Sequence, residues 1–134
     1  MKVAVVGSRG LSVINLEHYL PEGVREIVSG GAQGIDTCAR EYAILNKIRL
    51  TEFLPEYHKY GKGAPLKRNL QIIDYADQVI VFWDGKSRGT KYVIDTCKRK
   101  DKKITVYKAK DIPFDVQKSK GSKTEPFPIK KAPF

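Results

Sequence analysis

Three short segments of this chain combine glycine with hydroxyl and cationic residues, and each follows an apolar run. "GSRG" follows residues 3–6, "SGGAQG" follows residues 26–28, and "DGKSRG" follows residues 78–83. Glycine lets a backbone approach a ligand closely, and free N–H groups at the start of a following helix attract anions. The pattern therefore predicts a site for a phosphate group.

The candidate ligand residues are glycines of these segments and neighbouring residues with a hydroxyl, an amide or a positive charge. An arginine can pair with phosphate oxygens through a bidentate fork, and an asparagine can hydrogen-bond a ribose or a base edge. We interpret Asp36, near a predicted helix start, as a cap. The candidates are Gly7, Ser8, Arg9, Ser29, Gly30, Gly31, Gly34, Arg68, Asn69, Gly85, Ser87, Arg88, Gly89 and Thr90.

The two best-known nucleotide motifs are absent from the sequence. "GSRGLS" lacks the spacing of the GxGxxG dinucleotide fingerprint, and "GGAQGID" lacks the lysine of the GxxxxGK[ST] phosphate loop. Cys38 and Cys97 have no partner at metal-ligand spacing, so we expect buried thiols. We predict no metal site and no resident cofactor, while Mg²⁺ arriving with a nucleotide stays open.

Short apolar runs alternating with helical patterns should position these segments. We expect strands at 3–6, 26–28, 48–54, 78–83 and 104–107, and helices at 11–20, 35–46, 66–75 and 90–100. Alternation of this kind predicts an α/β, Rossmann-like doubly wound parallel sheet of about five strands, with helices on both faces. The three glycine segments would then lie on one edge of the sheet, beside the crevice between the first and fourth strands.

The 134 residues suffice for one domain, which we place at 1–110, followed by an irregular tail at 111–134 with prolines and lysines. Residues 1–85 carry equal numbers of basic and acidic side chains, so the net charge of +10 comes from residues 86–134. This basic half suits nucleic acid or another anion, or a solvated surface. Because no apolar run approaches the roughly 20 residues of a membrane span, and no signal peptide is evident, we expect no membrane partner and a cytoplasmic location.

Taken in order, "VVGSRG", "SGGAQGID", "APLKRN" and "DGKSRGT" resemble the SMF/DprA-LOG (SLOG) superfamily, and most closely its small single-domain members. The resemblance covers residues 3–107 and implies a Rossmann-like domain that binds nucleotides or their derivatives, often as a homodimer. It assigns ligand contacts to four groups of positions, which are Gly7, Ser8 and Arg9; Gly30, Gly31, Gly34 and Asp36; Arg68 and Asn69; and Gly85, Ser87, Gly89 and Thr90.

The resemblance leaves three functions open. LOG-type members hydrolyse the N-glycosidic bond of nucleoside monophosphates, but the position of their catalytic glutamate is Val93 here, which leaves Asp84 as the candidate carboxylate of an enzyme. DprA-like members bind single-stranded DNA, which the basic second half would suit. We favour the third function, a nucleotide-binding sensor or carrier.

Overall fold

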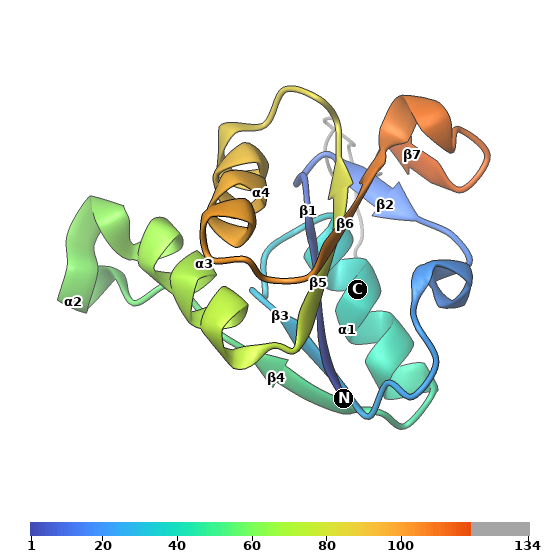
Figure 1. Ribbon diagram of the computed structural model, residues 1–134, viewed down its shortest axis with the longest axis horizontal. Coiled ribbons are helices and arrows are strands. Elements are labelled where there is room, and N and C mark those ends of the chain that lie inside the picture. The colour runs from blue at the N-terminus through green and yellow to red at the C-terminus, as the bar shows by residue number, and fades with distance from the viewer. Residues whose placement is uncertain (119–134) are drawn as a thin grey trace, which may run out of the picture.

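A five-stranded parallel sheet forms the centre of the computed structural model, which describes residues 1–118 (Figure 1). Its strand order is β4-β3-β1-β5-β6, and every neighbouring pair runs parallel. This confirms the predicted Rossmann-like α/β class. The strands are β1 (Lys2–Gly7), β3 (Glu26–Ser29), β4 (Arg49–Glu52), β5 (Gln78–Trp83) and β6 (Ile104–Lys108).

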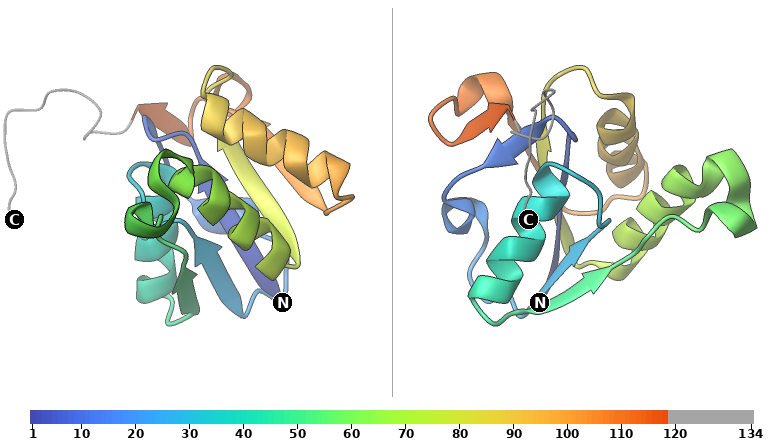
Figure 2. Two further views of the ribbon diagram at one scale, coloured as in Figure 1. Left: turned by 90° about the vertical axis from the view of Figure 1, so that its left-hand side faces the viewer. Right: turned by 180° about the vertical axis from the view of Figure 1, so that it is seen from behind.

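Helices cover both faces of the sheet, with α1 on one face and α3 and α4 on the other (Figure 2). Alternate residues of β1 supply both cores, because Val3 and Val5 pack in the α1 layer while Ala4 and Val6 pack in the α3/α4 layer. The helices are α1 (Ile35–Leu45), α2 (Tyr57–Tyr60), α3 (Ala64–Tyr75) and α4 (Arg88–Arg99), with 3-10 turns at Leu16–Tyr19, Gly61–Gly63 and Ala109–Asp111.

The chain leaves the neighbouring strands β1 and β5 toward opposite faces of the sheet. After β1 it passes over the α1 side, whereas after β5 it enters α4 on the other side (Figures 1 and 2). Ligands of open α/β sheets bind at this kind of switch point, beyond the carboxyl ends of the strands. The fold therefore places the first and third glycine segments on either side of such a crevice.

The predicted helix at 11–20 is wrong. Residues Leu11–Val13 form strand β2, Asn15 adopts a left-handed conformation with φ 59°, and a 3-10 turn follows. Leu11 and Val13 point inward on alternate positions of β2, as a strand requires. The partner of β2 is β7 (Val116–Lys118), which lies about a hundred residues away in the sequence and could not be inferred from local periodicity.

The predicted irregular tail at 111–134 includes a strand in its first residues, so this prediction is wrong at 116–118. Strand β7 pairs antiparallel with β2, and Val116 is buried in the core on the α1 side. Asp115 accepts hydrogen bonds from the Tyr19 hydroxyl and from Asn15 Nδ2, and its carbonyl accepts one from Ile14 N–H. Phe114 is exposed, and residues 119–134, with Phe127 and Phe134, lie outside the described residues.

Residues 1–118 lack two structural features. In this range no helix is long and apolar enough to cross a membrane. Nor does it contain a group of three or more His, Cys, Asp or Glu side chains that could hold a metal ion.

Replacing Tyr19 by phenylalanine tests the contact between the 3-10 turn and the segment before β7. The hydrogen bond to Asp115, together with burial, raises the pKa of Tyr19 from 10.0 to about 12. We expect Tyr19→Phe to lower the free energy of unfolding by about 1 kcal/mol at pH 7, measured by urea denaturation. The protonated phenol is the donor, so this contribution is complete below pH 10.0 and is lost as the pH rises through about 12.

Tyr92→Phe is the matched control, because the Tyr92 hydroxyl has no hydrogen bond within residues 1–118. This control should change the free energy of unfolding by less than about 0.5 kcal/mol. Equal effects of the two substitutions would contradict the contribution assigned to the Tyr19 hydroxyl.

Candidate ligand-binding site

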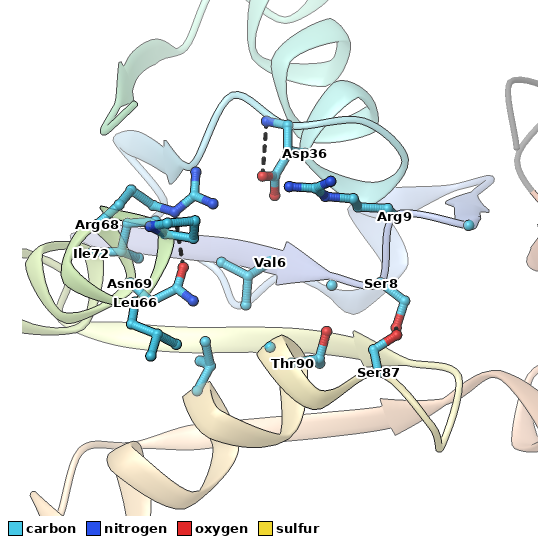
Figure 3. A pocket seen from close by; sticks show the side chains of 16 residues that line it. Val6, Ser8, Arg9, Asp36, Leu66, Arg68, Asn69, Ile72, Ser87 and Thr90 are labelled. Atoms are coloured by element: carbon cyan, nitrogen blue, oxygen red, sulfur yellow. Dashed lines mark hydrogen bonds between the residues drawn. The ribbon is translucent and has the colours of Figure 1, made fainter. Parts of the chain in front are cut away.

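A pocket of about 370 Å³ opens at the carboxyl edge of the sheet, where β1 and β5 end (Figure 3). Its volume falls within the range of roughly 300–1,000 Å³ that is typical of small-molecule sites. The lining comes from the end of β1 and the segment after it, the turn before α1 and its first turn, one side of α3, and the start of α4. The lining residues are Val6, Gly7, Ser8, Arg9, Gly10, Ala32, Asp36, Pro65, Leu66, Arg68, Asn69, Ile72, Ser87, Gly89, Thr90 and Val93.

Hydroxyl groups join the two segments that flank the crevice. Ser8 Oγ accepts a hydrogen bond from Asp84 N–H at 3.2 Å and lies 3.0 Å from Ser87 Oγ, which in turn lies 2.9 Å from Asp84 Oδ2. Each hydroxyl has one proton, so all three contacts are satisfied when Ser8 donates to Ser87 and Ser87 donates to Asp84. This closed ring of hydrogen bonds fixes the β1 segment against the β5 segment.

The amino end of α4 faces the pocket. Ser87 precedes the helix, and its hydroxyl belongs to the ring with Ser8 and Asp84 instead of capping α4. Among the described residues, the N–H groups of Arg88, Gly89 and Thr90 have no hydrogen-bond acceptor. Gly89 and Thr90 line the pocket, so free donors and the positive end of the helix dipole lie next to it.

One side of α3 forms another wall, because Pro65, Arg68, Asn69 and Ile72 recur at helical spacing. Arg68 is buried, with 7% of its surface exposed, and donates to the Gly30 carbonyl at 2.5 Å and to Asn69 Oδ1 at 3.0 Å. Burial lowers the pKa of Arg68, an effect opposed by the charge of Asp36. The hydrogen bond from Arg68 to Gly30 therefore connects α3 to the second glycine segment, while the Arg68 side chain also lines the pocket.

The start of α1 adds a carboxylate to this site. Asp36 Oδ2 accepts a hydrogen bond from Ala32 N–H at 3.1 Å, and 7% of the Asp36 surface is exposed. Burial raises the pKa of Asp36, while the Ala32 N–H and the charge of Arg68 oppose that rise. Figure 3 shows the Asp36 carboxylate and the Arg9 guanidinium pointing toward each other across the mouth of the pocket.

The structure brings together eight of the fourteen predicted ligand residues. These eight line the pocket: Gly7, Ser8, Arg9, Arg68, Asn69, Ser87, Gly89 and Thr90. The remaining six positions, which lie behind or beside the wall, are Ser29, Gly30, Gly31, Gly34, Gly85 and Arg88.

Asp84, the candidate catalytic residue, is also outside the pocket lining. Its carboxylate accepts hydrogen bonds from Lys86 N–H and Ser87 N–H, both at 2.8 Å, and from the Ser87 hydroxyl. Burial favours the neutral acid, but these hydrogen bonds outweigh burial and lower the pKa of Asp84. The structure thus gives Asp84 the role of holding the segment before α4.

The glycines outside the pocket permit close packing behind it. A Cβ atom on Gly30 would meet Arg68 Nη1, and would lie 2.9 Å from Arg68 Cζ and 3.0 Å from Asp36 Oδ2. Gly34 has φ 72° and would meet the carbonyl of Arg9. The glycines of the second segment therefore determine where Arg68, Asp36 and the β1 segment lie, while Ala32 of the same segment lines the pocket.

Sequence reasoning left several pocket residues out. The helical pattern alone indicates a cap at Asp36, which does accept a backbone N–H, but this residue also lines the pocket, at a position to which only the resemblance assigns a ligand contact. Val93 lines the pocket as well, one helical turn after Thr90, so an apolar side chain occupies the position that the resemblance associates with a glutamate. Of the other apolar lining residues, Val6 and Ile72 belong to the core on the α3/α4 side, whereas Leu66 is exposed on α3.

Comparisons of this chain with models of protein families, with curated proteins and with solved structures found no significant match.

Two glycine-to-alanine substitutions separate packing behind the pocket from space within it. Gly30→Ala should lower the free energy of unfolding by about 1–3 kcal/mol, because the new methyl group overlaps the buried Arg68 side chain. Gly89→Ala is the control, since no atom of residues 1–118 outside its chain neighbours and the backbone of its own helix lies within 4 Å of the new Cβ, and alanine favours the helix. We expect it to leave stability unchanged or slightly raised in urea denaturation. A tolerated Gly30→Ala would contradict the packing assigned to Arg68.

Proposed function

We propose that this protein binds a nucleotide, or a phosphorylated nucleotide derivative, in the pocket between the ends of β1 and β5, as a sensor or carrier. The observation that carries the proposal is the convergence of an uncapped helix start, three hydroxyl side chains and the Arg9 guanidinium on one pocket at the switch point of the sheet. The resemblance to the SMF/DprA-LOG superfamily adds support, because its segments supply these groups.

The phosphate would bind at the amino end of α4. The free N–H groups of Gly89 and Thr90 point toward that position, and the Thr90 hydroxyl adds a further donor. Arg9 is exposed on the pocket rim and has no ion pair within the described residues, so its guanidinium is available for phosphate oxygens. Any Mg²⁺ would enter as the counterion of the ligand's phosphates.

The remaining walls suit the sugar and base. Leu66, Ile72 and Val93 provide an apolar surface on α3 and α4 against which a flat ring can pack. Asn69 accepts from Arg68 Nε through Oδ1, so its amide nitrogen stays free as a donor. A pocket with anion donors at one end and apolar side chains beside them matches a phosphorylated nucleoside better than a free phosphate ion.

Binding has more support than N-glycosidic hydrolysis. A glycosidase needs carboxylates beside the scissile bond, yet Val93 occupies the wall and Asp84 is engaged in the segment before α4. The single-stranded nucleic-acid alternative also has less support, since Arg9 and Arg68 are the only cations in the described lining and Arg68 is engaged by backbone and Asn69 oxygens. The free thiols Cys38 and Cys97 fit the expected cytoplasmic location.

A panel of the common nucleoside mono- and diphosphates tests this proposal. At least one member should raise the melting temperature of the wild-type protein and bind measurably by calorimetry. Arg9→Gln should weaken that binding about tenfold or more, because it removes a charged partner of the phosphate.

Arg25→Gln is the matched control, because Arg25 is exposed and precedes β3 at the opposite edge of the sheet. Its affinity for the ligand should equal that of the wild type. Equal losses in both variants would point to general charge attraction, and no binding by any member of the panel would reject the proposal.

A further inference from the structure

Asp36 places a buried negative charge in a pocket whose other charged groups are cationic. It is the only acidic residue in the described lining, and its carboxylate points into the pocket from the start of α1 (Figure 3). The amino end of α4, with Thr90, lies on the other side of the β1 end. A carboxylate there repels an anionic ligand, so its presence requires a reason beyond the attraction of phosphate.

One Asp36 oxygen has no protein donor within the described part of the chain. Oδ2 accepts the Ala32 N–H, whereas Oδ1 has no hydrogen bond among residues 1–118. Arg68 donates to the Gly30 carbonyl and to Asn69 instead, and it forms no ion pair with Asp36 there. Ser29 is fully buried behind the pocket and its Oγ has no partner at hydrogen-bond distance within residues 1–118, but its hydroxyl lies close enough to the Asp36 carboxylate to oppose the rise in the pKa of Asp36.

The hydrogen bond to the turn before α1 does not by itself explain why residue 36 is an acid. A neutral asparagine would also present an oxygen to the Ala32 N–H, without burying a charge. Oδ1 is not one of the fully buried atoms without a partner in residues 1–118, so this oxygen is accessible. A ligand can therefore supply a donor to it from the pocket side, toward which the carboxylate points.

We infer that Asp36 is a specificity-determining residue, whose Oδ1 accepts a hydrogen bond from a sugar hydroxyl of the ligand. The inference rests on the proposed function, because it takes the phosphate to lie at the start of α4. A nucleotide ribose lies next to its phosphate and carries two hydroxyl donors, so it can reach across the pocket toward α1. Asp36 thereby selects ribonucleotides from ligands that lack these hydroxyls.

Asp36 should make the pocket discriminate strongly between ribonucleotides and nucleotides without sugar hydroxyls. Sites built to hydrogen-bond a hydroxyl reject an analogue without it, because a buried polar group is then left unpaired. For a charged acceptor, the loss corresponds to an affinity difference of about tenfold to a hundredfold. Apolar packing alone would give almost equal affinities for the two ligands.

Calorimetry on the full chain tests the inference with matched pairs of ligands. Each common ribonucleoside 5′-monophosphate is compared with its 2′,3′-dideoxy counterpart, and inorganic phosphate serves as a third probe. For the wild type we expect the ribonucleotide to bind about tenfold to a hundredfold more tightly than the dideoxynucleotide. This comparison requires no substitution and is therefore independent of any folding defect.

Asp36→Asn then assigns the discrimination to this side chain. The variant retains an oxygen for the Ala32 N–H but removes the charge, and we expect ribonucleotide affinity to fall to within about threefold of dideoxynucleotide affinity. Affinity for inorganic phosphate should stay the same or rise, because a like charge has gone. A purely structural role would instead weaken all three probes together. The matched control is Asp95→Asn, which removes an exposed carboxylate that pairs with Lys91 and should preserve the wild-type pattern.

The outcomes separate the two proposals. Equal affinity of the wild type for ribo- and dideoxynucleotides would overturn the role of Asp36 while leaving phosphate binding intact. Discrimination that persists in Asp36→Asn would also overturn it. If ribonucleotides, dideoxynucleotides and inorganic phosphate all fail to bind the wild type, the proposed function and this inference are both rejected.

Discussion

The close approach of the β1 and β5 ends at Gly7 is the constraint on which the site depends. A Cβ atom there would meet the Phe82 carbonyl and the Ile35 side chain, so only glycine lets the chain pass this close to β5 and α1. This close approach places Ser8 where its N–H donates to the Phe82 carbonyl and its hydroxyl forms hydrogen bonds with Asp84 and Ser87. These hydrogen bonds fix the segment before α4, so that the first residues of this helix line the pocket. One residue without a side chain thus determines how both walls of the crevice meet.

The polar residues of the site divide into those that hold it together and those that remain free. The hydrogen bonds of Arg68, Ser8 and Asp84 connect neighbouring segments of the chain. Arg9 and one oxygen of Asp36 have no such partner in the part of the chain that the structure describes. Bonded groups give the pocket its shape, because buried polar groups that are satisfied keep a fixed geometry. The free groups give it a chemical preference, and their opposite charges match the two polar parts of a phosphorylated sugar.

The sheet could be predicted from the sequence because its strands are continuous apolar runs, and such runs are typical of strands that are buried on both faces. It failed at residues 11–20, where the strand depends on a partner near residue 117 that contributes no local signal. It identified Ser8, Arg9 and Thr90 as pocket residues because glycine segments after strands must share one edge of a parallel sheet. The sequence could not show that Gly30 and Gly89 have different roles. Both are glycines in such segments, yet one packs against Arg68 and the other leaves open space, a difference that only three-dimensional packing reveals.

The central claim is that the amino end of α4 holds the phosphate of the ligand. Amide ¹H–¹⁵N spectra recorded while a nucleoside monophosphate is added test this claim most directly, because they report on each backbone N–H separately. The account predicts that the Gly89 and Thr90 amide resonances shift most, together with those of Ser8 and Arg9. Shifts confined to the basic segment 98–110, with the start of α4 unchanged, would contradict it.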